Sequence, residues 1–95
     1  MVAQETSLKV LVEKPTSRQL DDLKVSGWPI WTKEASTFDW EYDEKEVCYI
    51  LEGDVTVKTP GDAVSFGKGD LVTFPKGLKC VWNIKRAVRK HYKFG

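Results

Sequence analysis

The chain has 95 residues, 41% of them hydrophobic and 31% charged, a balance typical of one small globular domain and not of a disordered chain or a multidomain enzyme. Its 15 basic and 14 acidic residues leave a formal net charge of +1, so no global field directs the protein to nucleic acid or to acidic membranes. The longest apolar run, residues 47–51, is far shorter than the roughly 20 residues that a membrane-spanning helix needs.

The beginning of the chain and its cysteines indicate the compartment. The first residues lack the basic-then-apolar pattern of a secretory signal, and the acidic Glu5 and Glu13 argue against a transit peptide. Two cysteines, Cys48 and Cys80, are too few for the disulfide framework of a small secreted domain, so we expect free thiols. These features predict a cytoplasmic protein.

The first predicted elements are a strand and one short helix, which together occupy residues 7–27. Apolar residues alternate with polar ones at the start, in the two-residue period of a half-buried strand; they are Leu8, Val10 and Val12. Thr16 and Gln19 then have the spacing of a capping box, which predicts a helix that Gly27 closes.

The remainder of the chain is typical of short strands separated by turns. The runs rich in β-branched and aromatic residues are 28–33, 37–42, 46–52, 55–59, 63–66, 71–74, 79–84 and 87–94. Gly53 and Asp54 separate two of these runs as a two-residue hairpin signal. Because such closely spaced strands must pair antiparallel, the sequence predicts an all-β sandwich or barrel.

Two stretches of the chain resemble the two motifs of the cupin family. In the first, Glu46 precedes Gly53; the second runs from Gly69 through Pro75 and Gly77 to Cys80, which stands where cupins place a histidine.

The resemblance is specific to one subgroup of cupins. The string Trp28-Pro29-Ile30-Trp31 and the segment 71–78 look like the small single-domain cupins of plants and thermophilic bacteria that are related to ethanolamine-utilisation protein Q and ureidoglycine aminohydrolase. The resemblance implies one cupin domain over residues 1–95, with a jelly-roll barrel over 28–94 that encloses a pocket between two antiparallel sheets.

The metal ligands of the family are largely replaced in this chain. In metal-bearing cupins, two histidines that flank one residue, the motif glutamate and a later histidine bind one divalent ion. Here Trp40 and Tyr42 occupy the paired positions and Cys80 the later one, so only Glu46 remains. One carboxylate and one thiol cannot complete a coordination shell, and we therefore expect no metal and no cofactor.

An alternative register of the same strand would use its acidic residues as ligands. These residues are Asp39 and Glu41. A slip of one residue would, however, turn Phe38, Trp40 and Tyr42 out of the barrel, so we expect the aromatic side chains to point inward instead.

Alternation along the strands predicts the contents of the pocket. In the last strand, Val88, Lys90, Tyr92 and Phe94 share the inner face, while Arg89 and His91 point outward. The predicted pocket contains Glu46, Cys48, Cys80, Lys90, Trp40, Tyr42 and Trp82.

Two interpretations of these residues stay open. In the first, Glu46 is a general acid or base assisted by Cys80 and Lys90, and the substrate lies against Trp40, Tyr42, Cys48 and Trp82. In the second, Glu46 and Lys90 form a vestigial buried pair and the cysteines are small hydrophobes. We expect His91 to be a packed or surface residue, and the basic residues near the end of the chain to form a solvated face.

Three functions are compatible with this pattern. The chain is a metal-independent enzyme acting on a small polar metabolite, a module that binds or senses a small molecule without catalysis, or a structural protein. The expected partner is a small-molecule ligand, with no nucleic acid and no membrane. We also expect a homodimer, because the strand around Leu8 to Val12 leaves an open edge.

Overall fold

The structure is a computed structural model that describes residues 8–95. Its strands are β1 (Leu11–Glu13), β2 (Ile30–Lys33), β3 (Ser36–Glu41), β4 (Glu46–Thr59), β5 (Asp62–Gly67), β6 (Leu71–Phe74) and β7 (Lys79–Phe94). Every strand pairing is antiparallel, as predicted. No helix among these residues has both the length and the apolar character needed to cross a membrane.

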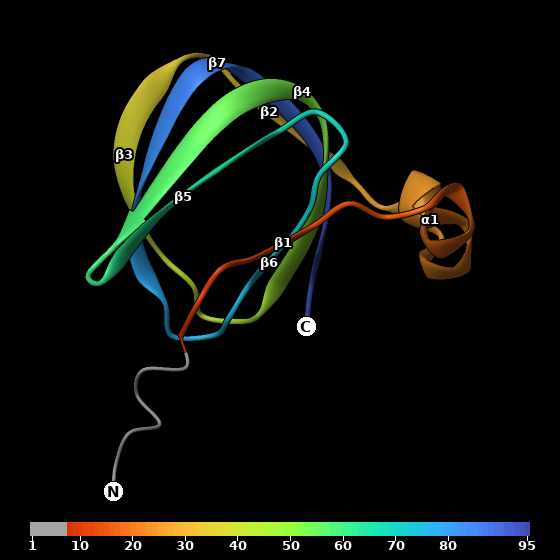
Figure 1. Cartoon of the computed structure of the whole chain (residues 1–95), viewed down its shortest axis with the longest axis horizontal. Coiled ribbons are helices and arrows are strands. Elements are labelled where there is room, and N and C mark those ends of the chain that lie inside the picture. The colour runs from red at the N-terminus through yellow and green to blue at the C-terminus, as the bar shows by residue number, and fades with distance from the viewer. Residues whose placement is uncertain (1–7) are drawn as a thin grey trace, which may run out of the picture.

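The two long strands, β4 and β7, are strongly curved and connect the two layers of a barrel (Figure 1). The first half of β4 pairs with β6 and with the second half of β7, which in turn pairs with β2. The second half of β4 pairs with β5 and with the first half of β7, which pairs with β3. The barrel architecture that the sequence predicted is therefore observed.

The hairpin predicted at Gly53 and Asp54 is wrong, because β4 continues through both residues. The ladder between β4 and β7 shifts register between Ile50 and Val55, which lets β4 bend without reversing. Gly53 has a φ of 129°, and a Cβ there would lie 2.8 Å from the Cα of Val88. Glycine is required because the two curved strands touch at this point.

The break predicted between residues 84 and 87 is also absent, since β7 runs without interruption from Lys79 to Phe94. Arg86 pairs with Asp54 within the irregular part of the ladder. The sequence pattern predicted a turn in each of these two segments. The structure has instead two continuous strands, β4 and β7, that curve together.

The first strand is shorter than predicted. Strand β1 begins at Leu11 and pairs with β6, so Leu8 and Val10 precede the strand, and Ser7 lies outside the described residues. Helix α1 (Ser17–Leu23) has the predicted capping box at Thr16.

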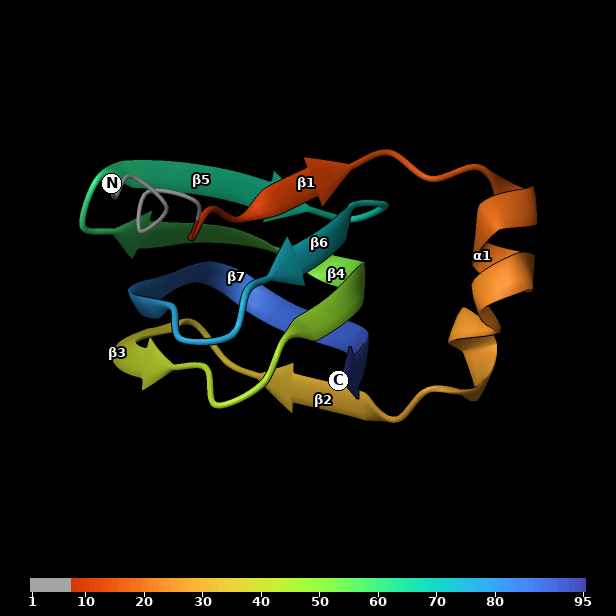
Figure 2. The same cartoon turned by 90° about the horizontal axis from the view of Figure 1, so that it is seen from below.

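The helix ends earlier than predicted. Lys24 adopts the left-handed conformation, with a φ of 58°, and its N–H caps the carbonyls of the last turn. A separate 3₁₀ turn, η2 (Val25–Gly27), follows, and α1 with η2 lies at one end of the molecule, between β1 and β2 (Figure 2).

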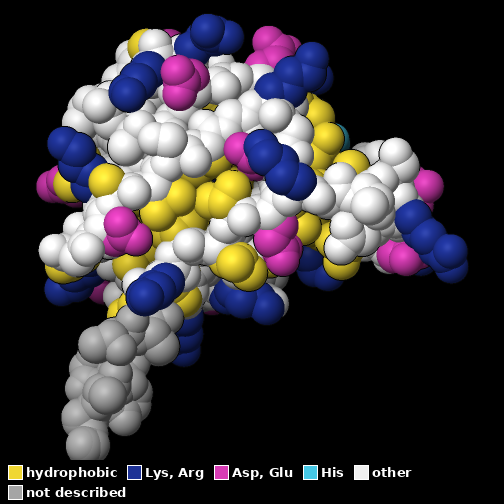
Figure 3. Space-filling view, in the orientation of Figure 1, with side chains coloured by type: hydrophobic (Ala, Val, Ile, Leu, Met, Phe, Trp, Pro, Cys, Tyr) yellow, Lys and Arg dark blue, Asp and Glu magenta, His cyan; other side chains and the backbone are white. Residues whose placement is uncertain are grey.

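The inner face of the barrel is apolar apart from the buried Glu46 and Lys90, and alternation places its residues as expected. On β7 the buried positions are Cys80, Trp82, Ile84, Val88 and Lys90. On the surface, basic and acidic side chains are intermingled around apolar atoms in the middle of one face (Figure 3). The expected homodimer stays a prediction.

Candidate functional site

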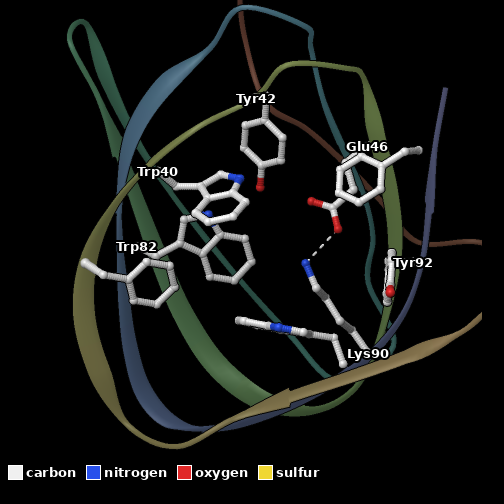
Figure 4. A pocket seen from close by; sticks show the side chains of 9 residues that line it. Trp40, Tyr42, Glu46, Trp82, Lys90 and Tyr92 are labelled. Atoms are coloured by element: carbon white, nitrogen blue, oxygen red, sulfur yellow. Dashed lines mark hydrogen bonds and ion pairs between the residues drawn. The ribbon is translucent and has the colours of Figure 1, made fainter.

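A pocket with a cavity of about 230 Å³ opens between β2, β3, β7 and the start of β4. Its lining consists of Trp31, Phe38, Trp40, Tyr42, Glu46, Trp82, Lys90, Tyr92 and Phe94. Figure 4 shows the labelled side chains pointing from the surrounding strands toward the centre of the barrel. Seven of the nine side chains are aromatic and two are charged.

The two charged residues form a buried ion pair. Lys90 Nζ donates to Glu46 Oε2 across 2.8 Å (Figure 4), and the side chains of Lys90 and Glu46 are only 6% and 4% exposed. The pair joins the first position of β4 to the inner face of β7. Because opposite charges neutralise each other, the pocket has no formal net charge.

The ammonium group of Lys90 also lies against two indole rings. Its Nζ is 4.9 Å from the ring centroid of Trp31 and 4.7 Å from that of Trp82, within the range of cation–π attraction. The lysine that alternation placed in the pocket is therefore held by a carboxylate and two aromatic faces.

Tyr42 and Trp40 occupy different depths of the pocket. Tyr42 is buried and stacks on Phe74, with ring centroids 4.8 Å apart. Burial, and then the charge of Glu46, raises the pKa of Tyr42 far above its ordinary value, so its hydroxyl remains protonated. Trp40 is 48% exposed and forms part of the rim.

The two cysteines predicted for the site lie in the core and not in the lining of the pocket. Both are free thiols, as expected, but neither belongs to the residues around the cavity. Burial, and next the charge of Glu46, raises the pKa of Cys80 to about 11. Burial likewise raises the pKa of Cys48 to about 12, although the Lys90 charge opposes the shift. Thiols held in this form are weak nucleophiles at neutral pH.

Of the sequence candidates, Glu46, Lys90, Trp40, Tyr42 and Trp82 therefore come together around one cavity. The cavity is also lined by four aromatic side chains that the sequence analysis did not assign to the site: Trp31, Phe38, Tyr92 and Phe94. Alternation placed Phe38, Tyr92 and Phe94 on inner faces, but core packing and pocket lining produce the same pattern. The distinction depends on where the barrel leaves space.

The acidic residues of the alternative metal register point away from the pocket. Strand β3 pairs with β7 in the register that sets Phe38 opposite Trp82. Both Asp39 and Glu41 are exposed. Within residues 8–95, no three His, Cys, Asp or Glu side chains are grouped as a metal site would require. His91 is half-buried, and its Nδ1 donates to the Trp28 carbonyl across 2.9 Å, which is a packing role.

Comparisons with known proteins agree with this architecture. Residues 20–92 match the profile of the family described as "EutQ-like cupin domain". A DUF861 family protein from Thermotoga maritima is 55% identical and superposes with a TM-score of 0.90, over 92% of this chain and 100% of that one. The EutQ protein of Clostridium difficile is 23% identical with a TM-score of 0.64, over 99% of this chain and 73% of that one.

One curated relative carries an activity in its name. It is "Acetate kinase EutQ" of Clostridioides difficile (strain 630), which is 32% identical over 57 residues. These residues are 60% of this chain and 36% of the relative, so the match spans about a third of that protein.

Proposed function

The chain belongs to the EutQ-like cupin family, and we propose that its jelly-roll barrel binds a small, uncharged and largely apolar molecule without transforming it. The observation that carries this proposal is the open cavity, about 230 Å³, lined by aromatic side chains and one internally neutralised ion pair.

The lining of the pocket supports a ligand because large apolar surfaces facing a cavity are stabilised when a molecule displaces the water. Binding pockets typically combine apolar walls with a few placed polar groups, and here those groups are Glu46, Lys90, Tyr42 and Trp82. An apolar protein cavity of about 150 Å³ can hold benzene. A ligand somewhat larger than one aromatic ring therefore fits.

The charged groups of the pocket favour binding over catalysis. The Lys90 Nζ is already held by Glu46 and by two indole rings, so it is not free to attack a bound molecule as a nucleophilic lysine must. Phosphoryl transfer, suggested by the name of the Clostridioides difficile relative, needs several cationic or backbone donors around phosphate groups. An aromatic lining with one paired lysine does not resemble such a cradle.

Catalysis is the second candidate, and one observation favours it. Glu46 and Lys90 face each other at 2.8 Å inside the cavity, a geometry in which a general acid and base can exchange a proton. If a bound molecule is turned over, Glu46→Gln should abolish the turnover while affinity is nearly retained. Recovery of the bound molecule unchanged supports the binding function.

A hydrocarbon probe tests the proposed pocket. We expect 2-phenylpropene to bind the full chain, measured by chemical-shift changes of the tryptophan indole N–H signals, and to be recovered unchanged by mass spectrometry. Trp40→Ala should weaken binding roughly fivefold, because an aromatic wall is lost at the exposed rim.

Leu11→Ala is the matched control, since Leu11 is 53% exposed on β1 and lies outside the pocket lining. Its affinity for 2-phenylpropene should equal that of the unaltered chain. Absence of binding up to the solubility limit of the probe, or equal weakening by both substitutions, would overturn the proposal.

A further inference from the structure

The polar groups inside the pocket interact with one another. The Lys90 ammonium donates to Glu46 Oε2 across 2.8 Å. Burial and the charge of Glu46 raise the pKa of Tyr42, a side-chain hydrogen bond with Glu46 adds to the rise, and one with Trp82 opposes it. Figure 4 shows the Tyr42 hydroxyl between the carboxylate of Glu46 and the indole nitrogen of Trp82. These four side chains therefore form one connected chain of polar groups.

These polar groups have little surface left for a ligand. The side chains of Glu46 and Lys90 are 4% and 6% exposed. Tyr42 and Trp82 are each 2% exposed, and Trp82 Nε1 is buried. Two indole rings also cover the ammonium, since Lys90 Nζ lies 4.9 Å from the ring centroid of Trp31 and 4.7 Å from that of Trp82. A polar group of a ligand in this interior would lose its water without gaining a partner, which is unfavourable.

The mouth of the pocket has the opposite character. Trp40 and Phe94 line the cavity and are 48% and 45% exposed. Together with Tyr42 they also line a second hollow of about 160 Å³, whose remaining lining residues are acidic and exposed: Glu41, Asp43 and Glu44. A polar group placed at this mouth keeps its contact with water and has carboxylate acceptors nearby. The pocket is thus apolar inside and polar where it opens.

We propose that the ligand is an amphiphile that enters the cavity with its apolar end first and leaves a terminal polar group, such as a hydroxyl, at the mouth beside Trp40 and Phe94. This inference rests on the proposed binding function and names the ligand class. The hydrocarbon body displaces water from the aromatic walls, while the terminal group stays hydrated. In a molecule whose polar group is next to its ring, burying the ring also buries the polar group.

Two isomeric alcohols isolate the position of the polar group. 3-Phenyl-1-propanol carries its hydroxyl at the end of a chain, and 2-phenyl-2-propanol carries it on the carbon attached to the ring. We expect the terminal alcohol to bind the full chain roughly tenfold more tightly in NMR titrations, because only its isomer must bury an unpaired hydroxyl. Nuclear Overhauser effects should connect the ring protons of 3-phenyl-1-propanol to Trp31 and its CH₂OH protons to Trp40.

Tyr42→Phe removes the hydroxyl that bonds to Glu46 and so frees an acceptor inside the pocket. The preference for the terminal alcohol should fall to roughly twofold, because 2-phenyl-2-propanol can then donate to Glu46. Tyr49→Phe is the matched control, since Tyr49 lies on β4 outside the pocket lining, and it should keep the full preference.

The Overhauser contacts in the unaltered chain test the orientation of the ligand even if Tyr42→Phe does not fold. Equal affinities of the two alcohols, contacts from the CH₂OH protons to Trp31, or the same preference in Tyr42→Phe as in Tyr49→Phe would each overturn the inference. Binding of 2-phenylpropene leaves the proposed function standing in those cases. If neither the alcohols nor 2-phenylpropene bind, both the inference and the proposed function are overturned.

Discussion

Two ion pairs that involve a buried carboxylate differ in what surrounds them. Glu46 and Lys90 have side chains only 4% and 6% exposed, and both line the cavity. Asp70 is equally buried, at 7%, but its partner Lys14 has a side chain 81% exposed. Asp70 also accepts the N–H of Gly67 across 2.8 Å, so it stabilises the turn between β5 and β6.

The two ion pairs therefore have different roles: the charge of Asp70 stabilises a turn of the fold, and the charges of Glu46 and Lys90 form part of the pocket. The Asp70 carboxylate lies beside a backbone amide that requires an acceptor, and Lys14 adds a solvated partner. Glu46 and Lys90 instead depend on each other inside an aromatic pocket. Removing one member should therefore have a larger effect in the pocket than at the turn.

The largest effect is expected from Lys90→Met. This substitution leaves Glu46 buried without a counter-charge, which typically costs 3–5 kcal/mol, so we expect a loss of about 4 kcal/mol in the free energy of unfolding, measured in urea. The double variant Glu46→Leu with Lys90→Met should recover most of the loss, because an apolar pair of similar size removes the buried charge. A single-variant loss below about 1 kcal/mol would contradict the comparison.

Asp70→Ala should have the next largest effect, about 2 kcal/mol, because the Gly67 amide loses its acceptor. Lys14→Met should cost less than about 1 kcal/mol, since its ammonium is solvated. Equal losses for the two variants in chemical unfolding would mean that the ion pair, and not the turn, determines the role of Asp70.

Alkaline pH should lower the free energy of unfolding moderately, through the thiol of Cys48 next to the pocket. Burial raises the pKa of Cys48 from 9.0 to about 12, so the folded state retains this proton where the unfolded state loses it. The contribution of the protonated Cys48 to the free energy of unfolding is complete below pH 9. It is lost as the pH rises toward 12, so that the free energy of unfolding falls by about 1 kcal/mol per pH unit. In urea unfolding at pH 9.5 and 10.5, the free energy of unfolding of Cys48→Ala should decline between the two pH values by about 1 kcal/mol less than that of the unaltered chain. An unchanged decline would be evidence against a buried neutral thiol.

The smallest effect is expected at the surface pair of Arg89 and Glu52, whose nitrogen and oxygen are 3.9 Å apart and whose side chains are 51% and 67% exposed. Arg89→Ala should change the free energy of unfolding by less than about 0.5 kcal/mol. A loss comparable to that of Asp70→Ala would show that exposure does not rank these pairs.

Several features of the fold and of the site could be predicted because they depend on local sequence patterns. Alternation along the last strand placed Lys90 inward and Arg89 outward, and the capping box at Thr16 was recognised from two residues. The continuity of β4 through Gly53 could not be predicted in this way. A glycine that allows a close approach to Val88 has the same local sequence signal as one that makes a turn.

The sequence by itself determined the antiparallel all-β class, the inner and outer faces of the strands, and the replacement of the family's histidines by Trp40, Tyr42 and Cys80. The first two properties follow from residue type and spacing alone, and the third is what the resemblance to the cupin family implies. Only the tertiary structure decided that Cys48 and Cys80 lie in the core, that Trp31 and Tyr92 line a cavity, and that the Trp82 donor is buried beside the Tyr42 hydroxyl. Those properties depend on the joint curvature of β4 and β7, which sets where the barrel is filled and where it stays open.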